Sequence, residues 1–200
     1  VRCRSINEKT LCKARARKPQ TQEDWDLAQA TWDKIEEDIR NQRLSQPVDL
    51  DTIDLDQVLL VDSFGVWESH GLDTEWKIRV INNFRSNLAN DFAVMTEKLK
   101  YDGFNELHQA AMEMWKHSGQ ELRLGKADFR SAFKTLPRSD DQSWLSWALV
   151  FNPNAGKLQI MPVWSQVFGS LGGVTGWFRT AKAIQHILLE LFFVVSFVYV

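Results

Sequence analysis

The hydrophobic positions in the first half of the chain recur mainly at helical spacing. Residues 22–44 place an apolar side chain every three or four positions with acidic residues between them, which predicts an amphipathic helix. Residues 95–117 predict helix in the same way, with Gly103 as a break between two helices. Residues 54–61 are expected to form a short helix after an acidic turn. Residues 76–81 instead alternate basic and aliphatic side chains, a pattern typical of a strand.

The second half of the chain contains stretches rich in β-branched and aromatic residues, which favour strands. Four strands are expected, over residues 122–128, 144–151, 158–163 and 194–200. Turn-forming residues at 152–156 join the second and third of them into a hairpin. An apolar stripe at helical spacing predicts a helix over residues 174–192. This mixture of helices and strands indicates an α+β fold.

The apolar residues at the end of the chain allow two explanations. Residues 187–200 could anchor the chain in a membrane, but a spanning helix needs roughly 20 residues. Glu190 lies inside the run, and a charged residue at the centre of a bilayer costs about 2.5–3.5 kcal/mol. A buried helix end followed by a strand avoids that cost. We therefore expect no membrane partner, with a tail anchor as the alternative.

Charge is distributed unevenly, although the whole chain carries a formal net charge of only −2. Residues 1–18 hold seven basic side chains and one acidic one, whereas residues 21–62 hold three basic and twelve acidic ones. The near-neutral total gives no indication of a nucleic-acid partner, but the basic stretch has the charge to contact phosphates. A solvated tail explains the same composition. Residues 1–20 are therefore expected to form a basic flexible arm.

Two cysteines, Cys3 and Cys12, lie in that basic stretch. No other Cys or His of the sequence has a spacing that would complete a zinc site with them. We expect both to be free thiols, because disulfides are rare in reducing compartments. An intracellular location, in the cytoplasm or the nucleus, follows from that expectation.

Four local patterns carry the candidate chemistry. They are Lys77-Ile78-Arg79-Val80-Ile81-Asn82-Asn83, Asp128-Phe129 with Ala132-Phe133, Phe168-Gly169, and Tyr199-Val200 at the end of the chain. In this order and at these separations they resemble the fingers and palm of a reverse transcriptase from a retrotransposon. The resemblance covers most of the chain, from about Trp25 to Val200. Two aspartates follow Tyr-Val in that family, so the chain is expected to be a fragment that ends inside the Tyr-Val-Asp-Asp motif.

The resemblance implies a fold and an activity. The fold would be an incomplete right-hand polymerase, with fingers and a palm whose antiparallel sheet is backed by helices. Residues 21–121 would form a fingers-like region with an N-terminal helix, and residues 122–200 a truncated palm-like region. The activity would be RNA-directed DNA synthesis, in which two Mg²⁺ ions assist deoxynucleotidyl transfer. The partners would be an RNA template, a DNA primer and deoxynucleoside triphosphates.

The resemblance assigns the catalytic and metal-binding roles to adjacent residues. Asp128 would be the catalytic carboxylate, and it would bind Mg²⁺ together with the backbone carbonyl of Phe129. One carboxylate cannot hold two ions, so the chain is expected to be inactive as it stands. Asn82 and Asn83 occupy positions where relatives usually carry acids. The alternative is therefore a degenerate, non-catalytic protein that derives from a reverse transcriptase and binds nucleic acid.

The resemblance also implies a nucleotide-binding set of Lys77, Arg79, Phe129, Phe133 and Gly169. The two basic residues would donate charge-assisted hydrogen bonds to the incoming triphosphate. Phe133 would leave no room for the 2′-hydroxyl of a ribonucleotide. Gly169 would let the backbone approach the new base pair. Taken singly, each has a plainer explanation, such as a surface residue of a strand or an aromatic residue of the core.

Overall fold

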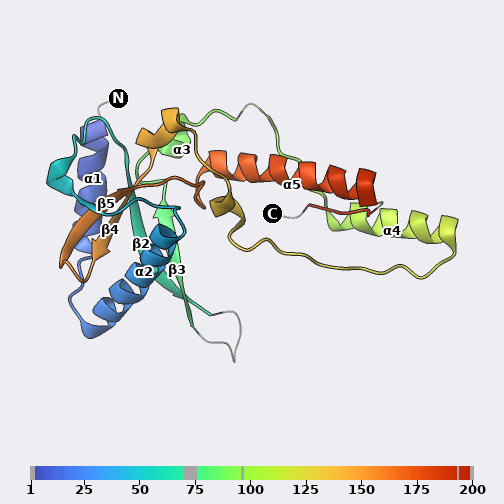
Figure 1. Cartoon of the computed structure of the whole chain (residues 1–200), viewed down its shortest axis with the longest axis horizontal. Coiled ribbons are helices and arrows are strands. Elements are labelled where there is room, and N and C mark those ends of the chain that lie inside the picture. Colours follow the sequence, from blue (N-terminus) through green and yellow to red (C-terminus); the bar gives the residue numbers. More distant parts are fainter. Residues whose placement is uncertain (1–2, 70–75, 96, 193, 199–200) are drawn as a thin grey trace.

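The computed structural model describes residues 3–69, 76–95, 97–192 and 194–198. A sheet with two helices packed on it forms one end of the molecule, and helices α4 (Phe104–Ser118) and α5 (Leu171–Phe192) project away from it (Figure 1). The α+β fold agrees with the expectation from the sequence. None of the described helices is long and apolar enough to cross a membrane.

The remaining helices and strands lie in or around the sheet. The other helices are α1 (Cys3–Ala16), α2 (Gln22–Arg40) and α3 (Ala89–Phe92), with 3-10 helices η1 (Leu50–Thr52), η2 (Ala132–Thr135) and η3 (Asp140–Leu145). The strands are β1 (Val48–Asp49), β2 (Leu60–Glu68), β3 (Lys77–Asn83), β4 (Trp147–Asn152) and β5 (Lys157–Pro162). They form one sheet in the order β1-β5-β4-β2-β3.

A short parallel contact joins two antiparallel hairpins in this sheet. β2 pairs with β3, and β4 pairs with β5, which also pairs with β1. Between the hairpins, β2 and β4 run parallel over three residue pairs that start at Leu60 and Trp147. Parallel neighbours need a long connection, which here contains β3, α3 and α4. The sheet is therefore mixed rather than antiparallel throughout, and it takes strands from both the 21–121 and the 122–200 region.

Alternating side chains give each face of the sheet its own core. On one face, Leu60, Leu149 and Ile160 pack with Leu11 and Ala14 of α1. On the other face the packed residues are Val61, Ala148, Val150, Met161 and, from α2, Trp32 and Ile35. The two helices therefore cover opposite faces, and the sheet forms the middle layer.

Several helices and strands lie where the sequence predicts them. α2 begins after Thr21, whose hydroxyl accepts the N–H of Asp24 while the Asp24 carboxylate accepts the N–H of Thr21. The strand predicted at 76–81 is β3, the predicted hairpin is β4–β5, and the last predicted helix is α5. Of the two helices predicted on either side of Gly103, the second forms, as α4, whereas the described residues of the first are irregular.

Two predicted strands are wrong within the described residues. Residues 122–128 are extended and largely exposed, and residues 194–198 are also irregular. Their β-branched and aromatic composition favours a strand, but a strand forms only where a neighbour offers backbone hydrogen-bond partners. Tyr199 and Val200, the rest of the second predicted strand, lie outside the described residues.

The short helix predicted at residues 54–61 is also wrong. This stretch forms turns that lead into β2, and the Asp54 carboxylate accepts the N–H of Asp56. Aspartate side chains stabilise such turns by bonding to the backbone two residues later. The local acidic residues therefore favour a turn over the helix that the apolar spacing predicts.

The basic stretch at the start of the chain is a helix rather than the flexible arm expected. α1 buries Ile6, Asn7, Thr10, Leu11 and Ala14. Its charged side chains face solvent, so a narrow apolar stripe is enough to dock the helix on the sheet. Composition alone gives a net charge and does not show how that charge is arranged around a helix.

The side chain of Asn7 fixes α1 to the segment that enters β2. Its amide nitrogen donates to the carbonyls of Leu55 and Val58, each at 2.8 Å, and its amide oxygen accepts the N–H of Leu60 at 2.9 Å. Asn7 is fully buried. Three backbone groups next to the core therefore depend on one side chain for their hydrogen bonds.

We expect Asn7→Ala to lower the free energy of unfolding by about 2–4 kcal/mol, because each unsatisfied buried backbone group costs about 1–3 kcal/mol. Urea denaturation followed by circular dichroism measures this change. The exposed Lys9→Ala on the same helix is the matched control and should stay within about 0.5 kcal/mol of the wild type. Equal stability of both variants would show that α1 is not docked as described.

At Gly65 of β2 the helix α2 lies close against the sheet. A Cβ atom added at Gly65 would lie 2.0 Å from Oγ1 of Thr31 and 2.8 Å from Cδ1 of Ile78. The end of an isoleucine side chain can move, whereas the Thr31 hydroxyl donates to the carbonyl of Leu27 at 2.6 Å. The absence of a side chain at Gly65 therefore sets the distance between helix and sheet.

We expect Gly65→Ala to destabilise the chain by about 1–3 kcal/mol, the usual effect of overpacking a core. Thr31→Ala in the same chain removes the clashing hydroxyl and should recover part of that loss, seen as coupling in a double-mutant cycle. Gly125→Ala is the control, because an added Cβ there meets nothing within 4 Å. Strict additivity of the two substitutions would contradict the close approach of α2.

Candidate functional site

Residues from three of the four sequence motifs line one cavity of about 380 Å³. Arg79 comes from β3, Phe133 from η2, and Phe168 from the loop that precedes α5. The remaining lining residues are Lys34, Glu37, Asp38 and Arg43 from α2 and the turn after it, Ile78 and Val80 from β3, and Arg130, Ser131, Ala132 and Lys134 around η2. The fold thus gathers positions that lie far apart in the sequence.

Phe168 contacts both of the other motif residues. The guanidinium carbon of Arg79 lies 4.9 Å from the centroid of the Phe168 ring, a cation–π contact. The Phe133 ring meets Phe168 edge-on, with centroids 5.5 Å apart, and lies 6.5 Å from the ring of Trp177 on α5. Arg79 also donates to Glu68 Oε1 at 3.1 Å across the β2–β3 hairpin. The rings of Phe133 and Phe168 therefore form the wall of the cavity next to Arg79.

The lining of the cavity is predominantly cationic, with five basic and two acidic side chains. Glu37 contacts Lys34 at 2.8 Å and Arg130 at 3.9 Å. The hydrogen bond from Lys34, and then its positive charge, hold the pKa of Glu37 below its ordinary value. Glu37 therefore stays ionised at neutral pH. With both acids charged, the cavity still has an excess of positive charge and suits an anionic ligand.

Asp38 is the buried acid of this cavity, and its residue is only 7% exposed. Its carboxylate pairs with Arg43, at 3.2 Å, and with Lys134 of η2. The sequence analysis missed Asp38, Glu37 and Lys34. The available signal was that Asp38 stands between Ile35 and Ile39, on the apolar stripe of the helix, where an acid needs a partner.

Gly169 lies beside the cavity but makes its close approach to β3. Its φ is +98°, and an added Cβ would lie 3.1 Å from the carbonyl oxygen of Asn82. The Asn90 amide donates to the carbonyl of Gly169 at 2.7 Å and accepts the N–H of Leu171 at 3.1 Å. A glycine is therefore required for the loop that carries Phe168 to pass this close to the strand.

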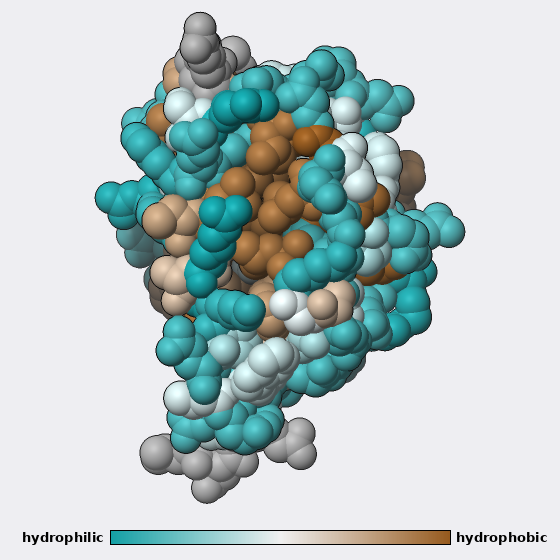
Figure 2. Space-filling view, turned by 90° about the vertical axis from the view of Figure 1, so that its left-hand side faces the viewer, coloured by the Kyte–Doolittle hydropathy of each residue, from teal (hydrophilic) through white to brown (hydrophobic). Residues whose placement is uncertain are grey.

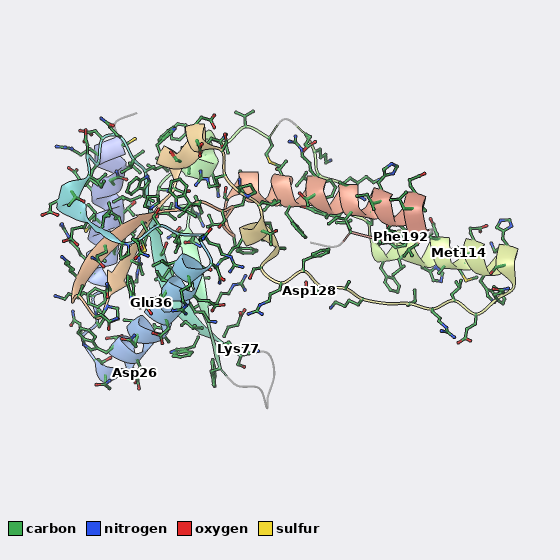
Figure 3. All side chains as sticks on the ribbon, in the orientation of Figure 1. Asp26, Glu36, Lys77, Met114, Asp128 and Phe192 are labelled. Carbon is green, nitrogen blue, oxygen red and sulfur yellow. The ribbon has the colours of Figure 1, made fainter. Side chains whose placement is uncertain are left out.

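Asp128, Phe129 and Lys77 are not part of the cavity lining. Asp128 is exposed on the extended segment between α4 and η2, whereas Lys77 is exposed at the start of β3 (Figure 3). The ring of Phe129 packs edge-on against Trp177, with centroids 5.2 Å apart. Of the residues that the sequence analysis singled out, the structure therefore brings Arg79 and Phe133 together, with Gly169 adjacent.

The described part of the chain contains no group of three Asp, Glu, His or Cys residues that could hold a metal ion. Binding of Mg²⁺ by Asp128 and the Phe129 carbonyl therefore stays a prediction from the resemblance.

A larger hollow, of about 540 Å³, lies where the two hairpins separate beyond their parallel contact. On the surface at the left of Figure 1, apolar residues gather in a depression ringed by hydrophilic ones (Figure 2). Arg17 lines the hollow, pairs with the buried Asp62 and has its guanidinium carbon 4.4 Å from the ring centroid of Phe64. No residue of the four sequence motifs lines it.

Asp102 fastens the last described segment of the chain to α5. Its carboxylate accepts the N–H of Val198 at 3.0 Å, and it also bonds to Lys182 and Gln185 of α5, at 2.9 and 3.2 Å. Burial alone would raise its pKa, but these hydrogen bonds, first that of Val198, together hold the pKa of Asp102 below its ordinary value. The segment that leads to Tyr199 is thus held by a carboxylate in its ionised form.

We expect Val198 to detach from α5 in acid. The folded pKa of Asp102 is lower than its unfolded value of about 3.9. The ionised carboxylate therefore stabilises the folded state fully above the unfolded pKa, and this stabilisation is lost as the pH falls through the folded pKa. The amide resonance of Val198, followed by NMR from neutral pH downward, should shift in that acidic range. Asp102→Asn should abolish the titration, and a Val198 shift that titrates equally in this variant would contradict the assignment.

A scan against models of known protein families finds no match, and a search of the curated proteins finds no significant relative.

Proposed function

We propose that this chain contains the nucleotide-binding part of an RNA-directed DNA polymerase from a retroelement. The cavity between α2, β3 and η2 would hold the incoming deoxynucleoside triphosphate. One observation carries the proposal: Arg79, Phe133 and Phe168 belong to three separate motifs of the resemblance and line the same cavity.

The charge of the cavity supports a triphosphate as its ligand. Five basic side chains outnumber two acidic ones, and phosphoryl transfer depends mainly on positioning and on balancing phosphate charge. The Arg79 side chain is 44% exposed and that of its partner Glu68 is 35% exposed, so their pair is of the weak, solvent-screened kind. A phosphate can therefore replace Glu68 as the partner of Arg79, and the planar guanidinium suits a phosphate group well.

The position of Phe133 supports a role in selecting deoxyribose over ribose in the bound nucleotide. Its ring lines the cavity and touches Phe168 and Trp177, so its orientation is fixed by aromatic neighbours. A fixed ring beside a bound sugar would collide with a 2′-hydroxyl, the group by which proteins tell RNA from DNA. The RNA template and the DNA primer belong to the proposal as the partners of such an enzyme.

A second candidate function is a non-catalytic protein that derives from a reverse transcriptase and binds nucleic acid. The observation that favours it is that the described residues contain no group of three Asp, Glu, His or Cys residues that could hold a metal ion. Asn82 and Asn83 support it further, because these amides stand at positions where an acid is usual in the family. Both candidates place the protein inside the cell, and the free thiols of Cys3 and Cys12 agree with a reducing compartment.

Primer extension on an RNA template, with the protein expressed from its whole reading frame, tests the proposal. Arg79→Ala should raise the KM for deoxynucleotides about tenfold or more, since a hydrogen bond to a charged group contributes about 1.5–3 kcal/mol. Arg123→Ala, on the exposed segment after α4, is the matched control and should leave KM unchanged.

Absence of extension by the wild-type protein, with retained binding of an RNA–DNA hybrid, would overturn the polymerase in favour of the non-catalytic candidate. An unchanged KM in Arg79→Ala would show that the triphosphate does not bind in this cavity.

A further inference from the structure

We propose that Asp38 is a positioning residue that sets the sugar specificity of the cavity by anchoring the turn that carries Phe133. The proposal rests on the proposed function, because it assigns a role to Asp38 in the choice between deoxyribonucleotides and ribonucleotides. Asp38 belongs to none of the motifs that carry the resemblance, and only the fold brings it to the site.

The anchor is an ion pair between residues that are 96 positions apart in the sequence. Asp38 projects from α2, and Lys134 directly follows Phe133 in η2. The carboxylate of Asp38 uses both oxygens, since Oδ1 bonds to Arg43 at 3.2 Å and Oδ2 bonds to Lys134. A buried carboxylate that is held by two cations leaves little freedom to any of the three groups.

The turn η2 is attached on several sides. Ala132, Phe133 and Leu136 pack against Trp177 of α5, as does Phe129 just before the turn. Just after the turn, the Leu136 carbonyl accepts the N–H of Gln166 at 2.8 Å. On the side of α2, Lys134 reaches Asp38. The ion pair with Asp38 therefore ties the turn of Phe133 to α2, while packing holds it to α5.

Loss of the Asp38 charge would leave Arg43 and Lys134 facing each other as like charges. Lys134 is partly exposed and can turn to solvent, whereas Arg43 is the more buried of the two. Movement of Lys134 would draw Phe133 away from Phe168 and widen the cavity where the sugar is expected to lie. The contact of Arg79 with the triphosphate would be retained, so discrimination between sugars should fall more than affinity.

Glu37 provides the matched control one position away. It lines the same cavity and carries the same charge. Its partner near η2 is Arg130, at 3.9 Å, and the Arg130 side chain is 93% exposed. Such a pair fixes no position, because an exposed side chain at this distance remains mobile. Glu37→Gln therefore changes the charge of the cavity as much as Asp38→Asn does, without releasing η2.

The test compares dATP with ATP in RNA-templated primer extension by the protein from its whole reading frame. Asp38→Asn should lower the ratio of kcat/KM for dATP over that for ATP about tenfold or more, a usual size for loss of one steric discrimination. Lys134→Gln should have the same effect, and the two substitutions together should add nothing further. Glu37→Gln should leave the ratio unchanged, and Arg43→Gln should lower stability while it keeps the ratio, because Lys134 retains Asp38.

A spectroscopic measurement tests the anchor without activity. The ¹⁹F resonance of 4-fluorophenylalanine at position 133 should shift and sharpen in Asp38→Asn and Lys134→Gln, and it should be unchanged in Glu37→Gln. A wild-type protein that extends no primer would overturn the proposed function. The fluorine signal would still show whether the Asp38–Lys134 ion pair positions Phe133. A discriminating wild-type enzyme whose ratio is unchanged in Asp38→Asn would overturn the role of Asp38 alone, as would an unchanged fluorine signal.

Discussion

The short parallel contact between β2 and β4 is the constraint on which the rest of the described fold depends. Each strand belongs to a separate hairpin, and only three residue pairs join the two hairpins into one sheet. At this contact the paired residues are buried except for the partly exposed Trp147, with Leu60 and Leu149 facing α1 and Val61 and Ala148 facing α2. The helices cover opposite faces of the same few residues, so the sheet and both helices stabilise one another there.

The candidate site follows from this arrangement. α2 lies against β2 and β3 because Gly65 lets it approach, and the approach brings the acidic end of α2 to the edge of the sheet. Segments that come later in the chain meet α2 there and supply Arg130, Phe133, Lys134 and Phe168. Asp38 pairs with Arg43, in the turn after α2, and with Lys134 of η2. Glu37 pairs with Lys34 of α2 and with the exposed Arg130, two residues before η2. The pairs of Asp38 thus hold distant segments together, and basic side chains still outnumber acidic ones in the cavity.

The sequence predicted the elements that have a strong period and a local stop signal. The helical stripe of residues 22–44 predicted α2, and the apolar stretches on either side of the turn at residues 152–156 predicted the β4–β5 hairpin. The prediction from sequence was wrong where an element depends on the segment that packs against it, because composition does not show that segment. Residues 122–128 have the composition of a strand and no neighbouring strand in the described structure, and α1 carries the charge of a flexible arm on a helix that is docked.

The sequence by itself determined the local periods, the turn positions and the residue types of the candidate chemistry, among them Arg79 and Phe133, because these depend on neighbours along the chain. Only the tertiary structure decided that these two share a cavity with Asp38, and that Asp128 lies outside it. The physical reason is that a buried ion pair such as Asp38–Lys134 joins positions far apart in the chain. Its partner is chosen by the packing of α2 and η2, which no local pattern records.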